Sequence, residues 1–259
     1  MMQWTGYGIS EKGTVRPTNQ DAFCIDNRLK VWAVADGMGG HVGGDIASQL
    51  VIDTIVQRLA GDCASLCGVP DRADQVLMDI VEDAHEAILD YVRRNPELTG
   101  MGTTLTLLHI SDGPYPIATI LHEGDSRAYL VRDGHLIQLT QDHSLVEQYI
   151  EQGLLTPEQA LHHPQRHILC RAMGLGPHAQ ADITTQPVQE EDLIILCTDG
   201  LTKMVDDEHL ITLLRSHPPH AEEVCSTLIA AALDAGGMDN VTVVACAKEV
   251  ASDTNISSG

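Results

Sequence analysis

Short runs of apolar and β-branched residues recur along the chain and predict β-strands. These runs lie at 31–35 (VWAVA), 103–110 (TTLTLLHI), 116–122 (PIATILH), 192–197 (DLIILC) and 241–247 (VTVVACA). A further stretch, 128–139 (AYLVRDGHLIQL), contains Asp133 followed by Gly134, a dipeptide typical of tight turns. It therefore predicts a β-hairpin.

Two apolar stripes with a helical period predict long helices. The first stripe spans 47–59, and we expect Asp45 to cap this helix and Gly61 to end it. The second stripe spans 77–91, and its helix is expected to end before Pro96. Two more helices are predicted near the end of the chain, at about 207–215 and 221–235.

The order of these elements indicates the fold class. Strands and helices come in blocks and do not alternate one by one, which favours an α+β fold with antiparallel sheets over a doubly wound parallel sheet. No repeat or long linker interrupts residues 1–249, so we expect a single domain followed by a polar tail at 250–259. From 142 to 176 the chain turns polar and irregular, with helical patterns at 145–152 and 157–161. We interpret this segment as a flap lying over a surface.

Charge excludes several kinds of partner. The 259 residues include 37 acidic and 15 basic ones, for a formal net charge of −22. Such a charge repels nucleic acid and anionic membranes and attracts cations. The start of the chain, MMQWTGYGIS, lacks the regions of a secretory signal, and no apolar run reaches the roughly 18 residues of a membrane span. We expect a soluble cytoplasmic protein, with a monomer as the default state.

The glycine-rich stretch VADGMGGHVGGD at 34–45 suggests a phosphate-binding loop, but the known loop types do not fit. A P-loop needs a lysine where the chain has Asp45, and a dinucleotide loop needs a glycine where it has Val42. An EF-hand loop needs an oxygen ligand where it has Met38. What remains is Asp36 at the end of a buried strand, followed by glycines.

Aspartates in similar contexts recur beside other strand ends. Taken singly, each is an ordinary turn residue. If they converge in a partly buried site, their repulsion must be neutralised, and divalent cations are suited to that role. Ligation by oxygen atoms alone favours Mg²⁺ or Mn²⁺ over zinc. The candidate residues are Asp21, Asp36, Asp125, Asp199 and Asp239.

Six fragments in order across the chain carry a family resemblance: RPTNQDAF, VADGMGGH, MGTT, GDSRAYL, CTDGL and GGMDNVTVV. Together they resemble the metal-dependent serine/threonine protein phosphatases of the 2C type, and DGMGGH resembles the bacterial branch of that family. The resemblance implies a central sandwich of two antiparallel β-sheets, flanked by helices on both outer faces. It also implies a metal cluster at one end of the sandwich.

The resemblance further implies roles for single residues. Asp36 bridges two ions, Gly37 offers its carbonyl to the second ion, and Asp21 acts through bound water. Asp199 and Asp239 complete the coordination of the first ion. A third, weaker ion is expected at Asp125 with help from Asp199.

Two basic residues complete the expected site. Arg16 matches the arginine that grips the substrate phosphate, a task suited to its planar fork of donors. His41 is a candidate general acid because imidazole titrates near neutral pH, and a structural role for it stays open. Two positions depart from the family pattern. Glu123 adds a carboxylate near the expected third ion, and Cys170 stands where a hydroxyl residue is frequent.

These residues predict a phosphatase that uses water as its nucleophile. The chain has neither a G-x-S-x-G elbow nor a C-x5-R loop. We therefore expect a water held between two Mg²⁺ or Mn²⁺ ions to attack the phosphorus of phosphoserine or phosphothreonine in proteins, opposing a Ser/Thr kinase. Two alternatives are a non-catalytic module that binds phosphoproteins or inhibits a kinase, and a phosphoesterase for small molecules.

Overall fold

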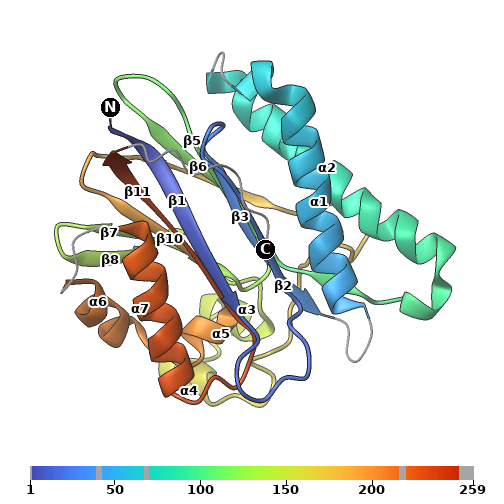
Figure 1. Ribbon diagram of the computed structural model, residues 1–259. Coiled ribbons are helices and arrows are strands. Elements are labelled where there is room, and N and C mark those ends of the chain that lie inside the picture. The colour runs from blue at the N-terminus through green and yellow to red at the C-terminus, as the bar shows by residue number, and fades with distance from the viewer. Residues whose placement is uncertain (1, 39–42, 67–69, 216–219, 251–259) are drawn as a thin grey trace.

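The computed structural model describes residues 2–38, 43–66, 70–215 and 220–250 of the chain. Two β-sheets pack against each other, and helices cover the outer face of each sheet (Figure 1). All strand pairs within the sheets are antiparallel. The structure confirms the predicted α+β fold with a central antiparallel sandwich.

The first sheet joins the two ends of the described chain. Strand β1 (Met2–Glu11) pairs along its whole length with β11 (Val241–Val250). The next strands are β10 (Leu193–Cys197), β7 (Arg127–Arg132) and β8 (His135–Gln138). Strands β7 and β8 form the predicted hairpin, and the two residues of its turn, Asp133 and Gly134, have φ angles of 51° and 72°.

The second sheet contains, in one of its strands, the first residues of the glycine-rich stretch, 34–38. Its strands are, in order, β2 (Asp21–Asp26), β3 (Val31–Met38), β5 (Leu105–Ile110), β6 (Ile117–Glu123) and β9 (Asp182–Pro187), and the short β4 (Gly102–Thr103) pairs with β3. The hydrophobic pattern does not predict β9. This edge strand, DITTQP, is largely polar and half-buried or exposed, so packing against the core leaves little trace in its sequence.

Helices α1 (Gly44–Leu66) and α2 (Pro70–Arg94) cover the outer face of the second sheet. The predicted end of α1 at Gly61 is wrong. A side chain at Gly61 would meet no atom within 4 Å, so this glycine lies on the open side of the helix. There it costs only about 1 kcal/mol relative to alanine, which a long packed helix tolerates. Asp45 lies in the first turn of α1, inside the helix and not before it.

The opposite outer face is covered by helices from the last third of the chain. The short α5 (Asp199–Thr202) follows β10 directly, and α6 (Asp207–Arg215) and α7 (Ala221–Asp234) confirm the two predicted helices. A short 3₁₀ turn, η1 (Pro96–Leu98), follows α2. Among the helices of the described residues, none combines the length and apolar character needed to cross a bilayer.

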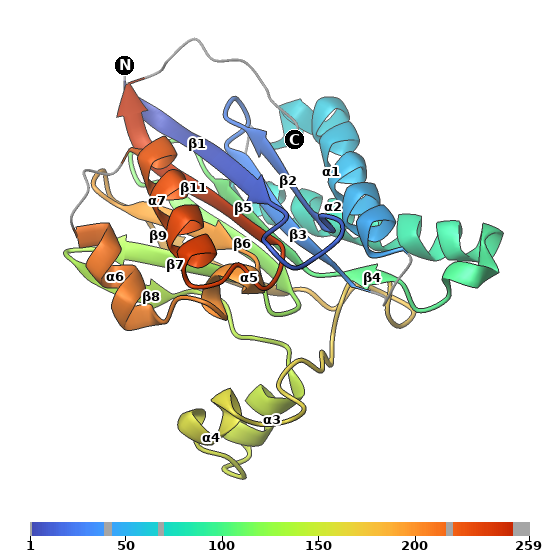
Figure 2. The same cartoon turned by 60° about the horizontal axis from the view of Figure 1, so that its bottom comes forward.

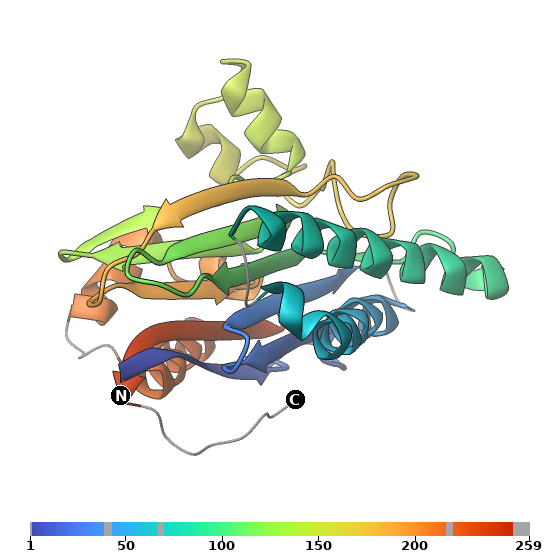
Figure 3. The ribbon, with the colours of Figure 1, turned by 90° about the horizontal axis from the view of Figure 1, so that it is seen from above.

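The segment expected to be a flap contains two short helices, α3 (Leu145–Glu151) and α4 (Pro157–Leu161), as predicted. They form a small lobe that projects from the sandwich and does not lie over a surface (Figures 2 and 3). The lobe buries Val146 and Ala160 and leaves Leu154 and Leu161 exposed.

The inner faces of the sheets change from apolar to polar at one end of the sandwich. Side chains alternate along a strand, so residues two apart share a face. Along β3, Trp32 and Val34 belong to the apolar cluster between the sheets, and Asp36 follows on the same face. Along β10, Leu196 belongs to that cluster, and Thr198 follows just beyond the strand. The alternation that builds the core therefore also delivers polar groups to its end.

Candidate metal centre

Asp21 and Asp36, which we call the inner pair, lie opposite each other on neighbouring strands. They are partners in the antiparallel register of β2 and β3, so their side chains point to the same face of the sheet. Asp21 reaches across to the other sheet, where its Oδ2 accepts hydrogen bonds from Thr198 Oγ1 at 2.8 Å and Thr242 Oγ1 at 2.7 Å. The inner pair therefore lies between the two sheets, at the polar end of the sandwich.

Backbone contacts hold Asp36 and Gly37 in place. The Asp36 N–H donates to Thr104 Oγ1 at 2.9 Å, and the Asp36 carbonyl accepts from the Thr104 N–H at 2.9 Å. The Gly37 N–H donates to the carbonyl of Gln20 at 3.1 Å. A Cβ atom at Gly37 would lie 2.0 Å from the carbonyl oxygen of Gly44, so no other residue fits this close approach of backbones.

Asp199 and Asp239, which we call the outer pair, come from the other sheet and its loops. Asp199 is the first residue of α5, and Asp239 lies in the loop before β11. A side chain on Gly200 would collide with the carbonyl of Asn240, only 1.9 Å from its Cβ position, so this glycine lets α5 pack directly against the loop. This packing brings the outer pair together.

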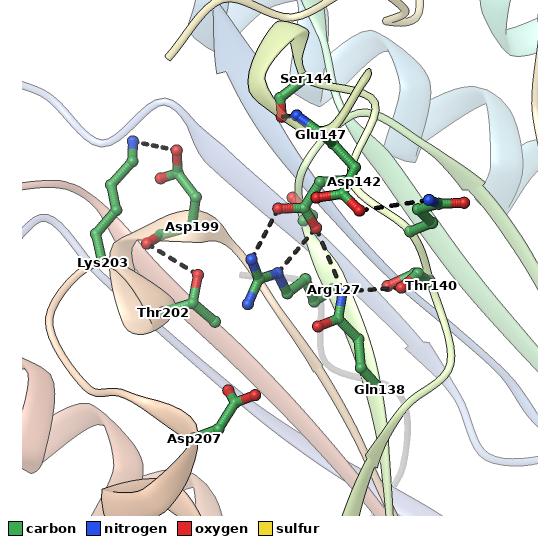
Figure 4. A network of polar contacts seen from close by, with 12 residues as sticks. Arg127, Gln138, Thr140, Asp142, Ser144, Glu147, Asp199, Thr202, Lys203 and Asp207 are labelled. Atoms are coloured by element: carbon green, nitrogen blue, oxygen red, sulfur yellow. Dashed lines mark hydrogen bonds and ion pairs between the residues drawn. The ribbon is translucent and has the colours of Figure 1, made fainter. Parts of the chain in front are cut away.

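Two basic side chains, those of Lys203 and Arg16, contact the carboxylates of the outer pair. Lys203 Nζ forms an ion pair with Asp199 Oδ2 (Figure 4) and lies 3.8 Å from Asp239 Oδ2. Arg16 Nη2 donates to that same Asp239 oxygen at 2.8 Å. Side-chain exposure rises from 12% for Asp199 and 20% for Asp239 to 39% for Lys203 and 49% for Arg16. The cations thus lie on the solvent side of the carboxylates.

Asn240 ties Arg16 to this end of the molecule. Its side-chain amide donates to the carbonyls of Lys12 and Thr18, both at 2.9 Å, and its Oδ1 accepts from the Gln20 N–H at 2.9 Å. The loop from β1 to β2, which carries Arg16, is therefore fastened to the residue next to Asp239.

Asp125 lies in the turn between β6 and β7. The neighbouring Ser126 Oγ is 2.7 Å from Thr104 Oγ1, the hydroxyl that also binds the backbone of Asp36. Burial raises the pKa of Asp125 to about 8, and the charge of Asp199 adds to the rise, whereas Lys203 opposes it. Asp125 is thus electrostatically linked to the outer pair.

The ionised form of the inner pair is unfavourable in the folded protein. Burial raises the pKa of Asp21 to about 7, although the hydroxyls of Thr242 and Thr198 oppose the rise. Burial, followed by the charges of nearby carboxylates, of which Asp21 and Asp199 contribute most, raises the pKa of Asp36 well above its usual range. Positive charge from a bound cation would lower these pKa values.

Two carboxylate oxygen atoms of the cluster lack a hydrogen-bond partner among the described residues. Asp21 Oδ1 and Asp199 Oδ1 are buried and have no hydrogen-bond partner within the described part of the chain. A buried carboxylate oxygen without a partner is costly, and a hard divalent ion would satisfy it. As the side chains stand, no three Asp, Glu, His or Cys residues among those described are arranged to hold an ion. Lys203 and Arg16 occupy oxygens of the outer pair in that arrangement.

The structure therefore brings together Asp21, Asp36, Gly37, Asp125, Asp199, Asp239 and Arg16, which come from the set named from the sequence. His41 lies outside the described residues. Glu123 turns another way, because its carboxylate accepts a hydrogen bond from the Gln180 N–H at 3.0 Å. Cys170 is exposed in the segment that carries the lobe.

The residues that support the cluster were not predicted from the sequence. Thr198 and Thr242 hold Asp21, and Lys203 holds Asp199. The threonines had a visible signal, since each continues the inner-face alternation of its strand beyond the apolar residues. Lys203 had a weaker one, its spacing of four residues from Asp199.

A cavity of about 610 Å³ opens elsewhere on the molecule. It is lined by His122 and by residues 138–141 and 181–184, between the end of β8 and the start of β9. None of the cluster carboxylates lines it. The cavity and the carboxylate cluster are separate features.

Comparison with known proteins identifies the class. The family model described as Protein phosphatase 2C matches residues 10–256, so the chain belongs to this family. The prediction of the family is confirmed.

The relatives include bacterial serine/threonine phosphatases. The serine/threonine protein phosphatase PstP of Mycobacterium tuberculosis is 38% identical over 239 residues, which cover 91% of this chain and 43% of that protein. The chain thus spans less than half the length of this relative. The serine/threonine phosphatase stp of Listeria innocua is 33% identical over 238 residues, covering 91% of this chain and 92% of that protein.

The solved structures agree with this assignment. The catalytic domain of PstP in complex with two manganese ions is similar, with a TM-score of 0.82 and 33% identity, covering 96% of this chain and 100% of that one. The predicted fold is therefore found in a family member that holds two metal ions.

Proposed function

We propose that this chain is a metal-dependent protein phosphatase that hydrolyses phosphoserine and phosphothreonine in proteins. One observation of the structure carries the proposal. Buried carboxylates converge at one end of the sandwich, and one oxygen of Asp21 and one of Asp199 have no partner in the described chain. Family membership and the two manganese ions in the similar PstP structure support the same conclusion.

The chain's oxygen donors fit two Mn²⁺ or Mg²⁺ ions. Asp36 would bridge the ions, Gly37 would offer its carbonyl, and Asp21 would act through water. Asp199 and Asp239 would complete the coordination of the first ion, and Asp125 with Asp199 would hold a third, more weakly bound ion. When bound, such ions supply a nucleophilic water at neutral pH and stabilise negative charge on the phosphoryl group.

The protein's own residues position the substrate. Arg16 lies at the exposed edge of the cluster, 2.8 Å from Asp239, where its guanidinium can bind two phosphate oxygens at once. Asn240 fixes the loop that carries Arg16, which reduces the freedom lost when substrate binds. His41 is the proposed proton donor to the departing serine or threonine oxygen.

The same proposal extends to the chain's partners and organisation. Its substrates are phosphorylated proteins, and a cognate cytoplasmic Ser/Thr kinase supplies them. Residues 1–249 act as one catalytic domain, and the protein works as a monomer.

Phosphate release tests the proposed function. Metal-stripped protein should hydrolyse a phosphothreonine peptide when Mn²⁺ is added and stop when a chelator is added. Hydrolysis that continues unchanged in chelator would contradict a metal-dependent reaction. Phosphopeptide binding without any turnover under saturating Mn²⁺ would favour the non-catalytic module.

A substrate comparison tests the remaining alternative. The phosphopeptide should be turned over with a higher kcat/KM than a nucleotide or a sugar phosphate under the same conditions. The opposite ranking would identify a small-molecule phosphoesterase.

A further inference from the structure

Lys203 lies where its ammonium group meets the outer pair. The backbone N–H of Lys203 donates to the carbonyl of Asp199 at 2.8 Å, closing the single turn of α5. Residues four apart on a helical turn share a face, so the Lys203 side chain lies beside the Asp199 carboxylate (Figure 4). Because Gly200 lets α5 pack against the next loop, Asp239 lies only 3.8 Å from the same ammonium.

The surroundings of Lys203 favour its charged form. Burial alone would lower the pKa of Lys203, but Asp199, Asp125 and Asp36 raise it to about 12. Three cluster carboxylates thus act on this one ammonium. The side chain is nevertheless 39% exposed, so it can move into solvent without being drawn through the protein.

We infer that Lys203 is a tethered cation that neutralises the outer pair in the metal-free protein and competes with a metal ion for it. This inference rests on the proposed metal centre. The ammonium and the first ion need the same carboxylates, Asp199 and Asp239, so both cannot hold them at once. A divalent ion brings two charges and displaces the ammonium. Metal binding must offset the free energy that is lost when the ion pair breaks. The ion pair therefore weakens the apparent affinity for the metal ion.

Calorimetric titration of metal-stripped protein with Mn²⁺ tests this inference. Lys203→Met removes the charge and keeps an unbranched side chain that is one atom shorter, and we expect it to bind Mn²⁺ about tenfold more tightly, or about 1.4 kcal/mol. Lys203→Arg, which keeps the charge, should stay near the affinity of the wild-type protein. Lys248→Met is the matched control, since Lys248 pairs with Glu190 near the end of β11 opposite to Asp239, and it should leave the affinity unchanged.

Thermal unfolding gives a second readout. Without metal, Lys203→Met should melt several degrees below the wild-type protein, and with saturating Mn²⁺ the two should melt together. Equal Mn²⁺ affinities for Lys203→Met and the wild-type protein would overturn the inference. An additional bound ion in Lys203→Met, with the affinity of the first ion unchanged, would also overturn it, because Lys203 would then replace a third ion.

The wild-type protein allows a test that does not depend on the variant folding. The NMR signal of the Lys203 ammonium nitrogen, assigned in labelled protein, should shift when diamagnetic Mg²⁺ saturates the site. A signal that does not move would contradict displacement. These readouts are independent of catalysis. A protein that binds Mn²⁺ in competition with Lys203 and lacks turnover would defeat the proposed function alone.

Discussion

The inner and outer pairs of aspartates are held by different means. Asp21 and Asp36 sit on strands, where hydroxyl and backbone groups fix them. Asp199 and Asp239 sit on a short helix and a loop, where Lys203 and Arg16 neutralise them. Neutral hydroxyls position a carboxylate without cancelling its charge, whereas cations cancel the charge and, on the proposed function, would have to leave a carboxylate that binds a metal ion. The inner pair is thus held without being neutralised, and the outer pair is neutralised by basic side chains of the protein itself.

The largest expected effect comes from replacing Asp36 of the inner pair. Asp36→Asn should lose Mn²⁺ binding and reduce kcat/KM by at least about a thousandfold, since it forfeits about 4 kcal/mol of metal-dependent stabilisation of the transition state. Phosphopeptide assays and calorimetry measure the two effects. Asp53→Asn, on the exposed face of α1, is the control and should behave as wild type. Retention of tight Mn²⁺ binding by Asp36→Asn would remove Asp36 from the metal centre.

Replacing a residue of the outer pair should reduce kcat/KM less than Asp36→Asn does. This reduction can be compared with that caused by replacing His41. We expect Asp239→Asn to reduce kcat/KM about a hundredfold and His41→Ala to reduce it less than tenfold, because a missing ligand weakens the charge stabilisation that dominates such reactions. Steady-state kinetics at saturating Mn²⁺ measures both. Equal losses would make His41 indispensable to the reaction.

The pH dependence of stability sharpens the contrast between the metal-free and metal-bound states. Burial raises the pKa of Asp21 from 3.8 to about 7 and that of Asp125 from 3.8 to about 8. At pH values between the unfolded and the folded pKa, the folded protein therefore holds more protons than the unfolded chain. Stability contributed by these groups is complete below pH 4 and is lost as pH rises towards 8, by several kcal/mol at about 1.4 kcal/mol for each unit of raised pKa. Denaturant unfolding of the metal-free protein at pH 5.5 and pH 8 measures the loss.

Metal should reverse this trend. Saturating Mn²⁺ at pH 8 supplies the charge that protons supply at lower pH, so it should restore the lost stability. Metal-free protein that is more stable at pH 8 than at pH 5.5 would contradict the raised pKa values of the cluster.

The hydroxyls around Asp21 should give the smallest effect. Thr242→Val removes a donor from the Asp21 carboxylate, which raises the pKa of Asp21 further and should weaken Mn²⁺ binding at pH 7 by up to about tenfold. The weakening should shrink at pH 9, where Asp21 is ionised in both proteins. Thr119→Val is the matched control, since Thr119 is also buried but donates to Asp74. A loss of affinity that is the same at both pH values would point to a packing defect.

The sequence allowed much of the fold to be predicted, because the apolar stripes of the central strands and the long helices follow their periods. The edge strand β9 and the end of α1 could not be predicted, because both are decided by exposure. A threonine-rich edge strand looks like a loop, and Gly61 looks like a helix end until its open surroundings are known.

The carboxylates of the site could be named from the sequence because each lies beside a strand end next to small residues. Their partners could not. Arg16 meets Asp239 across 223 positions of the chain, and that contact exists only after β1 pairs with β11. Lys203 directly follows a helix of four residues, which is too short to leave a periodic pattern.

Diffraction from crystals soaked in Mn²⁺, with anomalous scattering recorded for manganese, tests the central claim most directly. Two manganese peaks are expected about 4 Å apart, with the Asp36 carboxylate between them and the outer pair next to one of them. Manganese bound only away from Asp36 and Asp199, or no peak at saturating Mn²⁺, would contradict it.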